Sequence, residues 1–411
     1  MNPETLLYII LGIYVGSYLL ERVLSWLNLR NHQADLPQTL QGVYDDEKYA
    51  QSYEYHRVNY RFSLLQGGIS FVVMLALLYF GAFGWLDELL RNYTDHAIAL
   101  PLAFFGVLFL VGEITSIPFS WHRTFVIEER FGFNKTTPKT FWLDKLKSWL
   151  ITLLIGGSVM MIFLGLVDWL GENFWIWFWG FVSLFLVVVN IFYTSWLLPL
   201  FNKLTPLEDG SLREKIEDYS NSVGFPLDNI LVMDGSKRSS KANAFFSGLG
   251  KRKKIVLFDT LVENYEEEQL VAVLAHEVGH YKKRHIVQGF ILSIIQTGLI
   301  LFILSRFVST TELSNALGSS FNSIHLNLLA FGLLFSPIST AIGLLMNIFS
   351  RKNEFEADNY AATTYDANPL KEALIQLHAD NLSNLTPHPA YVFFHYSHPP
   401  LLQRINALAA V

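Results

Sequence analysis

The sequence predicts a mainly α, polytopic membrane protein that carries a small α+β unit on one side of the bilayer. Only 16% of the 411 residues are charged, compared with about 25% in an average soluble protein. The hydrophobic fraction is 51% and the mean hydropathy is +0.30, which together exclude a disordered chain. The uncharged residues also gather in long runs, as a chain that crosses a bilayer requires.

Seven runs without Asp, Glu, Lys or Arg predict about seven transmembrane helices. They cover residues 5–20, 62–86, 96–112, 148–167, 173–202, 286–305 and 313–350. Most reach the roughly 20 residues that a helix needs to span the hydrocarbon core. Backbone amides in lipid must be hydrogen-bonded within their own segment, and the runs lack the alternating polarity of barrel strands. Each run is therefore expected to form a helix.

Lys and Arg are divided very unevenly between the two sides of this topology. Of the 30 Lys and Arg residues, all but Arg91 and Arg306 fall on one side when the loops are assigned alternately. The positive-inside rule makes the rich side cytoplasmic. The N-terminus is then expected outside and the C-terminus in the cytoplasm.

The cytoplasmic stretch 203–285 has the composition of a soluble unit, with 13 basic and 13 acidic residues. A turn is predicted at 203–206, and apolar residues at helical spacing predict a helix over 211–223. Short β-rich runs follow at 230–233, 244–246 and 255–258. These runs, separated by turns that contain Gly and Ser, predict a small antiparallel sheet.

The motif H-E-x-x-H occurs at 276–280, in a helix predicted to begin after Asn264. Four residues advance a helix by about 400°, so His276 and His280 project from one face, as two ligands of one zinc ion require. Glu277 lies about 100° away, where it can take a proton from a metal-activated water. The motif predicts one zinc ion per chain, the alternative being a polar helix at the membrane surface.

A catalytic zinc ion takes three protein ligands and leaves one position open. Cysteine is absent, so the third ligand must be His, Asp or Glu. Glu354 and Asp358 are i and i+4 on a predicted helix, so Glu354 can bind the ion while Asp358 orients a ligating imidazole. Glu356 points away from that face and is expected to be solvated. Taken alone, this acidic cluster would be a surface helix end.

Several other polar groups are candidates for a role in the site. Near the C-terminus, His395 and His398 lie in the segment H-Y-S-H-P-P, whose prolines favour an extended chain. His398 or Tyr396 could donate a hydrogen bond to an oxyanion, the alternative being a histidine in a turn. His285 follows a basic run and is expected at the membrane surface. Glu113, inside the third span, is expected to face a polar interior or a water-filled cavity.

These motifs resemble those of the type I CAAX prenyl endopeptidases, integral-membrane zinc metalloproteases that process farnesylated C-termini in eukaryotes and have bacterial and archaeal relatives. The similar segments are 125–134, 204–207, 235–240, 243–246, 255–261, 276–280, 354–358 and 395–402. They cover most of the chain from the third span onward. We therefore divide the chain into a membrane region, residues 1–202, and a metallopeptidase region, residues 203–411, that includes the last two spans.

The resemblance implies a role for each candidate in the metal site. His276, His280 and Glu354 correspond to the zinc ligands of the family, and Glu277 to the base that activates water. Asp358 corresponds to a carboxylate behind the ligands that is sometimes described as a proton donor, and we favour the orienting role.

The resemblance also implies how a substrate binds. Asn243 would lie on an edge strand to which an extended peptide can add. His398 and Arg404 correspond to the pair that holds the scissile carbonyl and nearby substrate groups. The family fold is a ring of seven helices around a water-filled chamber, with the zinc ion near its cytoplasmic end.

The leading prediction is a membrane-embedded zinc metalloendopeptidase whose partners are the lipid bilayer and a peptide or protein substrate, with a farnesylated CAAX C-terminus as the candidate substrate class. The mild net charge of -6 gives no sign of a nucleic-acid partner. The lack of cysteine and of a C-terminal retention signal favours a bacterial cytoplasmic membrane, with the endoplasmic reticulum as the location in a eukaryote. The alternatives are a quality-control protease of the heat-shock type and a non-enzymatic transporter or translocon-associated protein.

Overall fold

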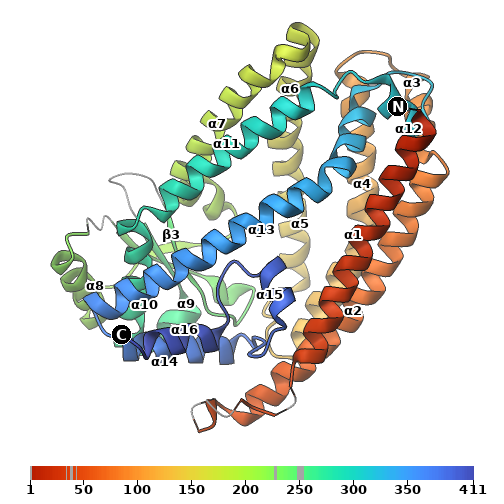
Figure 1. Ribbon diagram of the computed structural model, residues 1–411. Helices are drawn as coiled ribbons and strands as arrows, with labels where there is room; N and C mark the ends of the chain where they lie inside the picture. The colour runs from red at the N-terminus through yellow and green to blue at the C-terminus, as the bar shows by residue number, and fades with distance from the viewer. Residues whose placement is uncertain (1, 34, 38–39, 43, 226–228, 248–253) are drawn as a thin grey trace.

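The structure, a computed structural model, describes the chain except residues 1, 34, 38–39, 43, 226–228 and 248–253 (Figure 1). It is mainly helical. The helices are α1 (Pro3–Asn31), α2 (Asp46–Tyr79), α3 (Ala82–Arg91), α4 (Ala99–His122), α5 (Pro138–Ile151), α6 (Gly157–Leu170), α7 (Phe174–Phe192), α8 (Ser211–Ser222), α9 (Asp259–Asn264), α10 (Glu267–Lys282), α11 (His285–Ser305), α12 (Thr311–Ala316), α13 (Ile324–Thr364), α14 (Ala367–Asp380), α15 (Pro389–His395) and α16 (Leu401–Leu408). The strands are β1 (Leu204–Pro206), β2 (Asn229–Met233), β3 (Ala244–Ser247) and β4 (Lys254–Phe258).

Among the described residues, six helical stretches are long and apolar enough to cross a membrane. They are Pro3–Asn31, Asp46–Tyr79, Ala99–Glu128, Pro138–Leu200, His285–Ser305 and Ile324–Thr364. The fourth is 63 residues long and reverses direction at Gly171, where φ is 54°, so that α6 and α7 run side by side (Figure 1). Counting α6 and α7 separately gives seven passes, as the sequence predicts.

The ends of these helices differ from the uncharged runs. The second run breaks at Gly81, which has a φ of 64° and separates α2 from α3. The last run divides into the short α12 and the 41-residue α13. A helix can continue into water when its residues become charged, and α13 extends past the end of the apolar run in this way. Glu354 and Asp358 therefore lie on the same helix as the membrane segment.

A buried polar cluster fixes the start of α13. Asp87 of α3 is fully buried and accepts hydrogen bonds from Ser319 and Ser323, at 2.7 and 2.9 Å. His325, in the first turn of α13, lies with Nε2 2.9 Å from Asp87 Oδ1. Arg91 donates to Asp87 over 3.2 Å. This cluster joins α3 to the N-terminal end of α13.

The four strands form one sheet in the order β1-β2-β4-β3. The prediction of an antiparallel sheet is wrong for its centre, because β2 and β4 pair in parallel; β1 with β2 and β3 with β4 are antiparallel. Ile255, Val256 and Leu257 are all buried, as befits a central strand. The predicted turn at 203–206 is instead the strand β1, and β3 lies at the other edge.

Helix α10 lies at the centre of the helices packed beside the sheet. It contacts α8, α13 and α14, and residues on several of its faces are buried, including Val271, Ala275 and Val278. Its first turn is closed by a capping box between Glu266 and Gln269, which satisfies backbone amides that a helix start leaves free. The predicted helix over 211–223 is confirmed as α8.

Candidate metal centre and active site

Three side chains that can bind a metal ion converge between α10 and α13. The Nε2 atoms of His276 and His280 lie 3.1 Å apart. Glu354 places Oε1 3.2 Å from His280 Nε2 and Oε2 3.5 Å from His276 Nε2. His276 and Glu354 are buried, with exposed fractions of 7% and 4%. The structure thus brings together the three residues that the sequence singles out as ligands.

Each of these separations is close to the distance between two ligand atoms of a tetrahedral metal ion. Atoms bound at the Zn–N and Zn–O distances of proteins lie about 3.3–3.4 Å from one another in a tetrahedron. The buried Oε2 atom of Glu354 makes no hydrogen bond with the described residues, and a metal ion between the three side chains would satisfy it. Two imidazoles and one carboxylate also form a ligand set that catalytic zinc sites use.

The close approach of α10 to α13 depends on Gly279. A Cβ atom built at this position would lie 3.0 Å from Ala357 Cα and 3.1 Å from Ala357 O. The variable position before the second histidine is therefore restricted to a residue without a side chain. This contact sets the distance between the histidines of one helix and the carboxylates of the other.

Asp358 and Arg404 support the cluster from behind. Asp358 Oδ1 lies 2.8 Å from His276 Nδ1, the nitrogen on the far side of the ring from the cluster. Arg404 donates to Asp358 from Nε over 2.8 Å and from Nη2 over 2.6 Å, and its Nη1 lies 3.6 Å from Glu354. Asp358 and Arg404 are 1% and 6% exposed. A paired carboxylate of this kind orients the imidazole it contacts.

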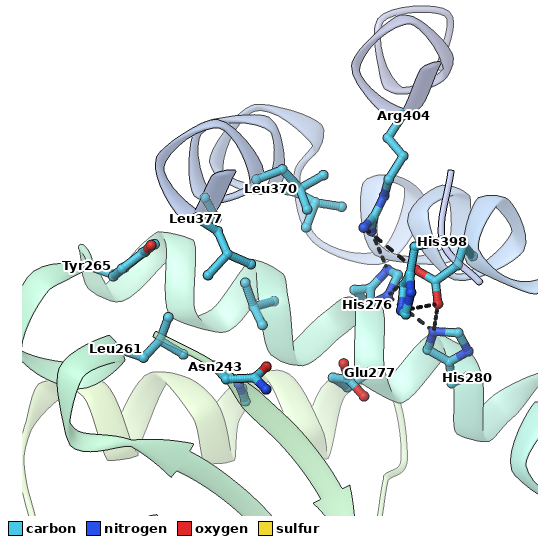
Figure 2. A pocket seen from close by; sticks show the side chains of 15 residues that line it. Asn243, Leu261, Tyr265, His276, Glu277, His280, Leu370, Leu377, His398 and Arg404 are labelled. Carbon is cyan, nitrogen blue, oxygen red and sulfur yellow. Dashed lines mark hydrogen bonds and ion pairs between the residues drawn. The ribbon is translucent and has the colours of Figure 1, made fainter. Parts of the chain in front are cut away.

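A cavity of about 310 Å³ opens beside the three ligand residues. Figure 2 shows Glu277 and His280 close together on this side of α10, with Asn243 from the chain just before β3 across the same space. His398 reaches in from the C-terminal segment, with Nε2 3.3 Å from Glu354 Oε1. One end of the cavity is apolar, with Leu261, Leu370, Leu374 and Leu377 in its wall.

Glu277 lies next to His276 in the motif. It lines the cavity on the helix that carries both histidines. Burial raises the pKa of its carboxyl group, although the neighbouring His276 and His280 oppose the shift. A carboxylate with a raised pKa is a stronger base, which suits a group that must take a proton from water.

The three C-terminal candidates, His395, Tyr396 and His398, lie in different surroundings. His398 lies at the cluster, whereas His395 lies 3.3 Å from Glu21 of α1. Tyr396 accepts a hydrogen bond from Arg351 through its backbone carbonyl and lines a different cavity. Of the three, His398 alone lines the cavity of the ligand cluster.

Glu113 of α4 is held by a neighbouring helix. Trp149 donates to it from Nε1 over 2.7 Å, and Lys145 donates over 3.0 Å. Both partners come from α5. An intramembrane carboxylate paired with a cation inside the protein avoids most of the cost of charge in lipid.

Two further residues lie beside the cluster, His285 and Glu356. His285 was expected at the membrane surface, but it is buried with 6% exposure and lies 3.0 Å from His280. Glu356, which was expected to be solvated, is 38% exposed, and its Oε2 also lies 3.2 Å from His285 Nε2. The basic run before His285 resembles a membrane-flanking segment. No sequence signal marks the sharp turn at Arg284, where φ is 60°, that places His285 against α10.

Comparisons with known proteins cover nearly the whole chain. Residues 25–203 match the family "CAAX prenyl protease N-terminal, five membrane helices", and residues 206–411 match peptidase family M48. The CAAX prenyl protease 1 of Saccharomyces cerevisiae is 36% identical over 97% of this chain and 94% of its own length. The CAAX prenyl protease 1 homolog of Homo sapiens is 33% identical over 91% and 88% of the two chains.

The fold has a solved counterpart. The crystal structure of S. mikatae Ste24p superposes with a TM-score of 0.92 at 33% identity, covering 98% of this chain and 99% of that one. These matches favour an enzyme over a transporter. The convergence of His276, His280 and Glu354 accords with a metallopeptidase. The chain therefore belongs to peptidase family M48, among the CAAX prenyl proteases, and is a multi-pass membrane metallopeptidase.

Proposed function

We propose that this protein is a zinc metalloendopeptidase that cleaves near the C-terminus of CAAX-type substrates. The observation that carries the proposal is the position of Glu277 in the same cavity as His276, His280 and Glu354, whose nearest nitrogen and oxygen atoms lie 3.1 to 3.5 Å apart from pair to pair. His276, His280 and Glu354 would hold one zinc ion. When bound, zinc polarises a carbonyl oxygen and lowers the pKa of water.

The remaining chemistry belongs to residues of the chain. Glu277 takes a proton from the attacking water and delivers it to the leaving amine. His398 donates a hydrogen bond to the oxygen of the former carbonyl as negative charge develops there. Asp358 accepts the Nδ1 proton of His276 and so keeps Nε2 free to bind the metal ion.

Arg404 acts mainly as a positioning residue. Its two hydrogen bonds fix the Asp358 carboxylate, and the paired charge keeps that carboxylate ionised in a buried place. Arg404 also lines the cavity, so a substrate oxygen could reach one of its remaining N–H groups. We therefore keep substrate binding, the role that the family resemblance implies, as a second role of Arg404.

The substrate backbone would add to the edge of the sheet. Strand β3 is terminal in the strand order, which leaves one of its sides unpaired by β4. An extended peptide there gains main-chain hydrogen bonds that do not depend on its sequence. Asn243 precedes β3 and is exposed at the cavity, so its side-chain amide can bond the same peptide.

The apolar end of the cavity suits an aliphatic residue of the substrate. Leu261, Leu370, Leu374 and Leu377 would surround such a side chain and remove it from water. This chemistry agrees with the aliphatic positions of a CAAX sequence. The names of the matched relatives support the same substrate class.

The membrane arrangement completes the proposal. The distribution of Lys and Arg supports a metal centre on the cytoplasmic side. We infer that the membrane helices enclose a water-filled chamber, as the family resemblance implies, and that the partly exposed Glu113–Lys145 pair faces it. The region boundaries 1–202 and 203–411 remain part of this proposal, as does the location in a bacterial cytoplasmic membrane or, in a eukaryote, in the endoplasmic reticulum.

The proposal is tested with two peptides that share a CAAX C-terminus, one farnesylated and one bare. Purified protein is assayed with each peptide, with and without a chelator, and its bound metal is measured. We expect about one zinc ion per chain, cleavage that the chelator abolishes, and faster turnover of the farnesylated peptide. Equal turnover would remove prenyl recognition from the proposal, and cleavage that survives complete removal of metal would overturn the zinc mechanism.

A further inference from the structure

One metal ligand is backed directly by a carboxylate, and the other is backed by a second imidazole. Building on the proposed metal centre, we propose that His285 and Glu356 form a hydrogen-bond relay that orients His280 and strengthens metal binding. His285 is thus a positioning residue: it acts through His280 and touches neither the metal ion nor the substrate.

The relay is a continuous line of short contacts. His280 Nε2 faces His276 and Glu354, so the other ring nitrogen, Nδ1, points away from the cluster. That Nδ1 atom lies 3.0 Å from His285 Nδ1. His285 Nε2 in turn lies 3.2 Å from Glu356 Oε2. Both distances are within hydrogen-bond range for ring nitrogens.

The protons of this line can be assigned once His280 binds a metal ion. Its Nε2 lone pair is then used, so the neutral ring carries its proton on Nδ1. Two imidazole nitrogens can bond only if one of them accepts, so His285 Nδ1 must be the acceptor. The neutral His285 ring therefore carries its proton on Nε2 and donates it to Glu356. Every hydrogen bond in the relay then has one donor and one acceptor.

The fold provides this relay through a chain reversal. Helix α10 ends at Lys282, Arg284 adopts a left-handed conformation with φ of 60°, and His285 is the first residue of α11. The reversal turns the His285 ring back onto α10, where its side chain is 5% exposed. Such placement of a buried polar ring is costly unless its nitrogens are paired.

Helix α13 completes both supporting arrangements. Its Glu354 faces the metal position, Asp358 supports His276, and Glu356 supports His285. The two supports are not equal in exposure. Asp358 is buried, whereas the Glu356 side chain is 38% exposed and also lies 3.7 Å from Lys352. The longer relay is therefore expected to contribute less than the direct contact of Asp358.

The competing explanation is that His285 only fills space and that Glu356 only belongs to a surface ion pair with Lys352. Two substitutions of His285 separate these explanations. His285→Phe keeps a ring of similar size but removes the acceptor for His280. His285→Asn loses volume but places its Oδ1 near the former Nδ1, so it can still accept from His280.

The experiment measures zinc affinity of the purified full-length protein by competition with a chelator. Loss of a partner behind a metal ligand typically weakens binding by about 10–100-fold. We expect a loss in this range for His285→Phe and a smaller loss for His285→Asn, with unchanged thermal unfolding of the metal-free proteins. Wild-type affinity in His285→Phe, or a greater loss in His285→Asn than in His285→Phe, would overturn the relay.

A second pair of variants tests Glu356. Glu356→Leu removes the acceptor at the end of the relay, whereas Lys352→Ala removes only its surface partner. We expect weaker zinc binding in the first and wild-type binding in the second. In His285→Phe/Glu356→Leu the affinity should equal that of His285→Phe, because Glu356 acts through His285. Equal effects of Glu356→Leu and Lys352→Ala, or additive effects in the double variant, would contradict the relay.

A control distinguishes failure of the relay from failure of the metal site itself. His280→Ala removes a ligand and should abolish stoichiometric zinc binding. If the wild type and His280→Ala bind zinc alike, the proposed metal centre is wrong. If only the His285 and Glu356 variants behave like the wild type, the metal centre stands and the relay is wrong.

Discussion

Two helices of similar length show how differently the two regions of this protein are held together. Helix α10 buries residues along its length, including Val271, Ala275 and Val278. Helix α7 is slightly longer but buries fewer residues, namely Phe174 and Phe178. In the metallopeptidase region, burial from water stabilises the fold. In the membrane region, lipid covers the apolar faces and close packing sets the geometry.

This difference predicts two kinds of mutational effect. Substitutions around α10 should change metal binding or chemistry, because polar groups there face the reacting atoms. Substitutions between the membrane helices should change stability and leave the chemistry unaltered.

The largest effect is expected for Glu277→Gln, which removes the base and keeps the shape of the side chain. Zinc content should remain at the wild-type level, and kcat should fall by about 10³-fold or more. Metal analysis and peptide cleavage of the same preparation measure both quantities. A variant that retains wild-type kcat would show that Glu277 is not the base.

A smaller effect is expected for Gly279→Ala. The new Cβ would lie 3.0 Å from the backbone of Ala357, so α10 and α13 must separate by a few tenths of an ångström. Because the metal ligands come from both helices, we expect zinc affinity to fall by about tenfold or more. Unchanged zinc affinity would show that this contact does not set the ligand spacing.

The matched substitution in the membrane region is Gly298→Ala in α11. A Cβ there would lie 3.0 Å from the indole ring of Trp179 in α7, whose Nε1 donates to Ile294 O over 2.8 Å. Overpacking at this contact should lower stability by about 1–3 kcal/mol. Thermal unfolding should register the loss, while zinc affinity stays at the wild-type value; a fall in zinc affinity would contradict the separation of the two regions.

The smallest effect is expected for Glu113→Gln. The amide oxygen can still accept from Trp149, but the ion pair with Lys145 is lost. The pair is partly exposed, so the expected loss of stability is about 1 kcal/mol. Cleavage of a soluble peptide should be within twofold of the wild type, and a large fall in kcat would place Glu113 in the catalytic machinery.

The features that the sequence predicts well are those with local geometry. His276, Glu277 and His280 share one helical turn, and Glu354 and Asp358 share another, so helical spacing alone predicts which side chains lie together. Uncharged runs likewise predict the membrane helices, because the length of a span is fixed by the bilayer.

The features that the sequence did not predict depend on how distant segments meet. The parallel pairing of β2 with β4 depends on how the chain between the two strands is arranged. The short apolar runs that mark the strands do not predict that arrangement. The burial of His285 follows from the reversal at Arg284, a residue type that rarely adopts a positive φ. A basic run before an apolar run carries no sign of that reversal.

Helix α13 joins the metal centre directly to the membrane region. Its 41 residues include Pro337 in the interior and span at most about 60 Å. The helix is anchored near one end by Asp87 and His325 and near the other by the crossing at Gly279. A ligand residue of the metal centre and a membrane-spanning segment thus belong to one helix, so a shift of the membrane segment would be transmitted to Glu354 without passing through a loop.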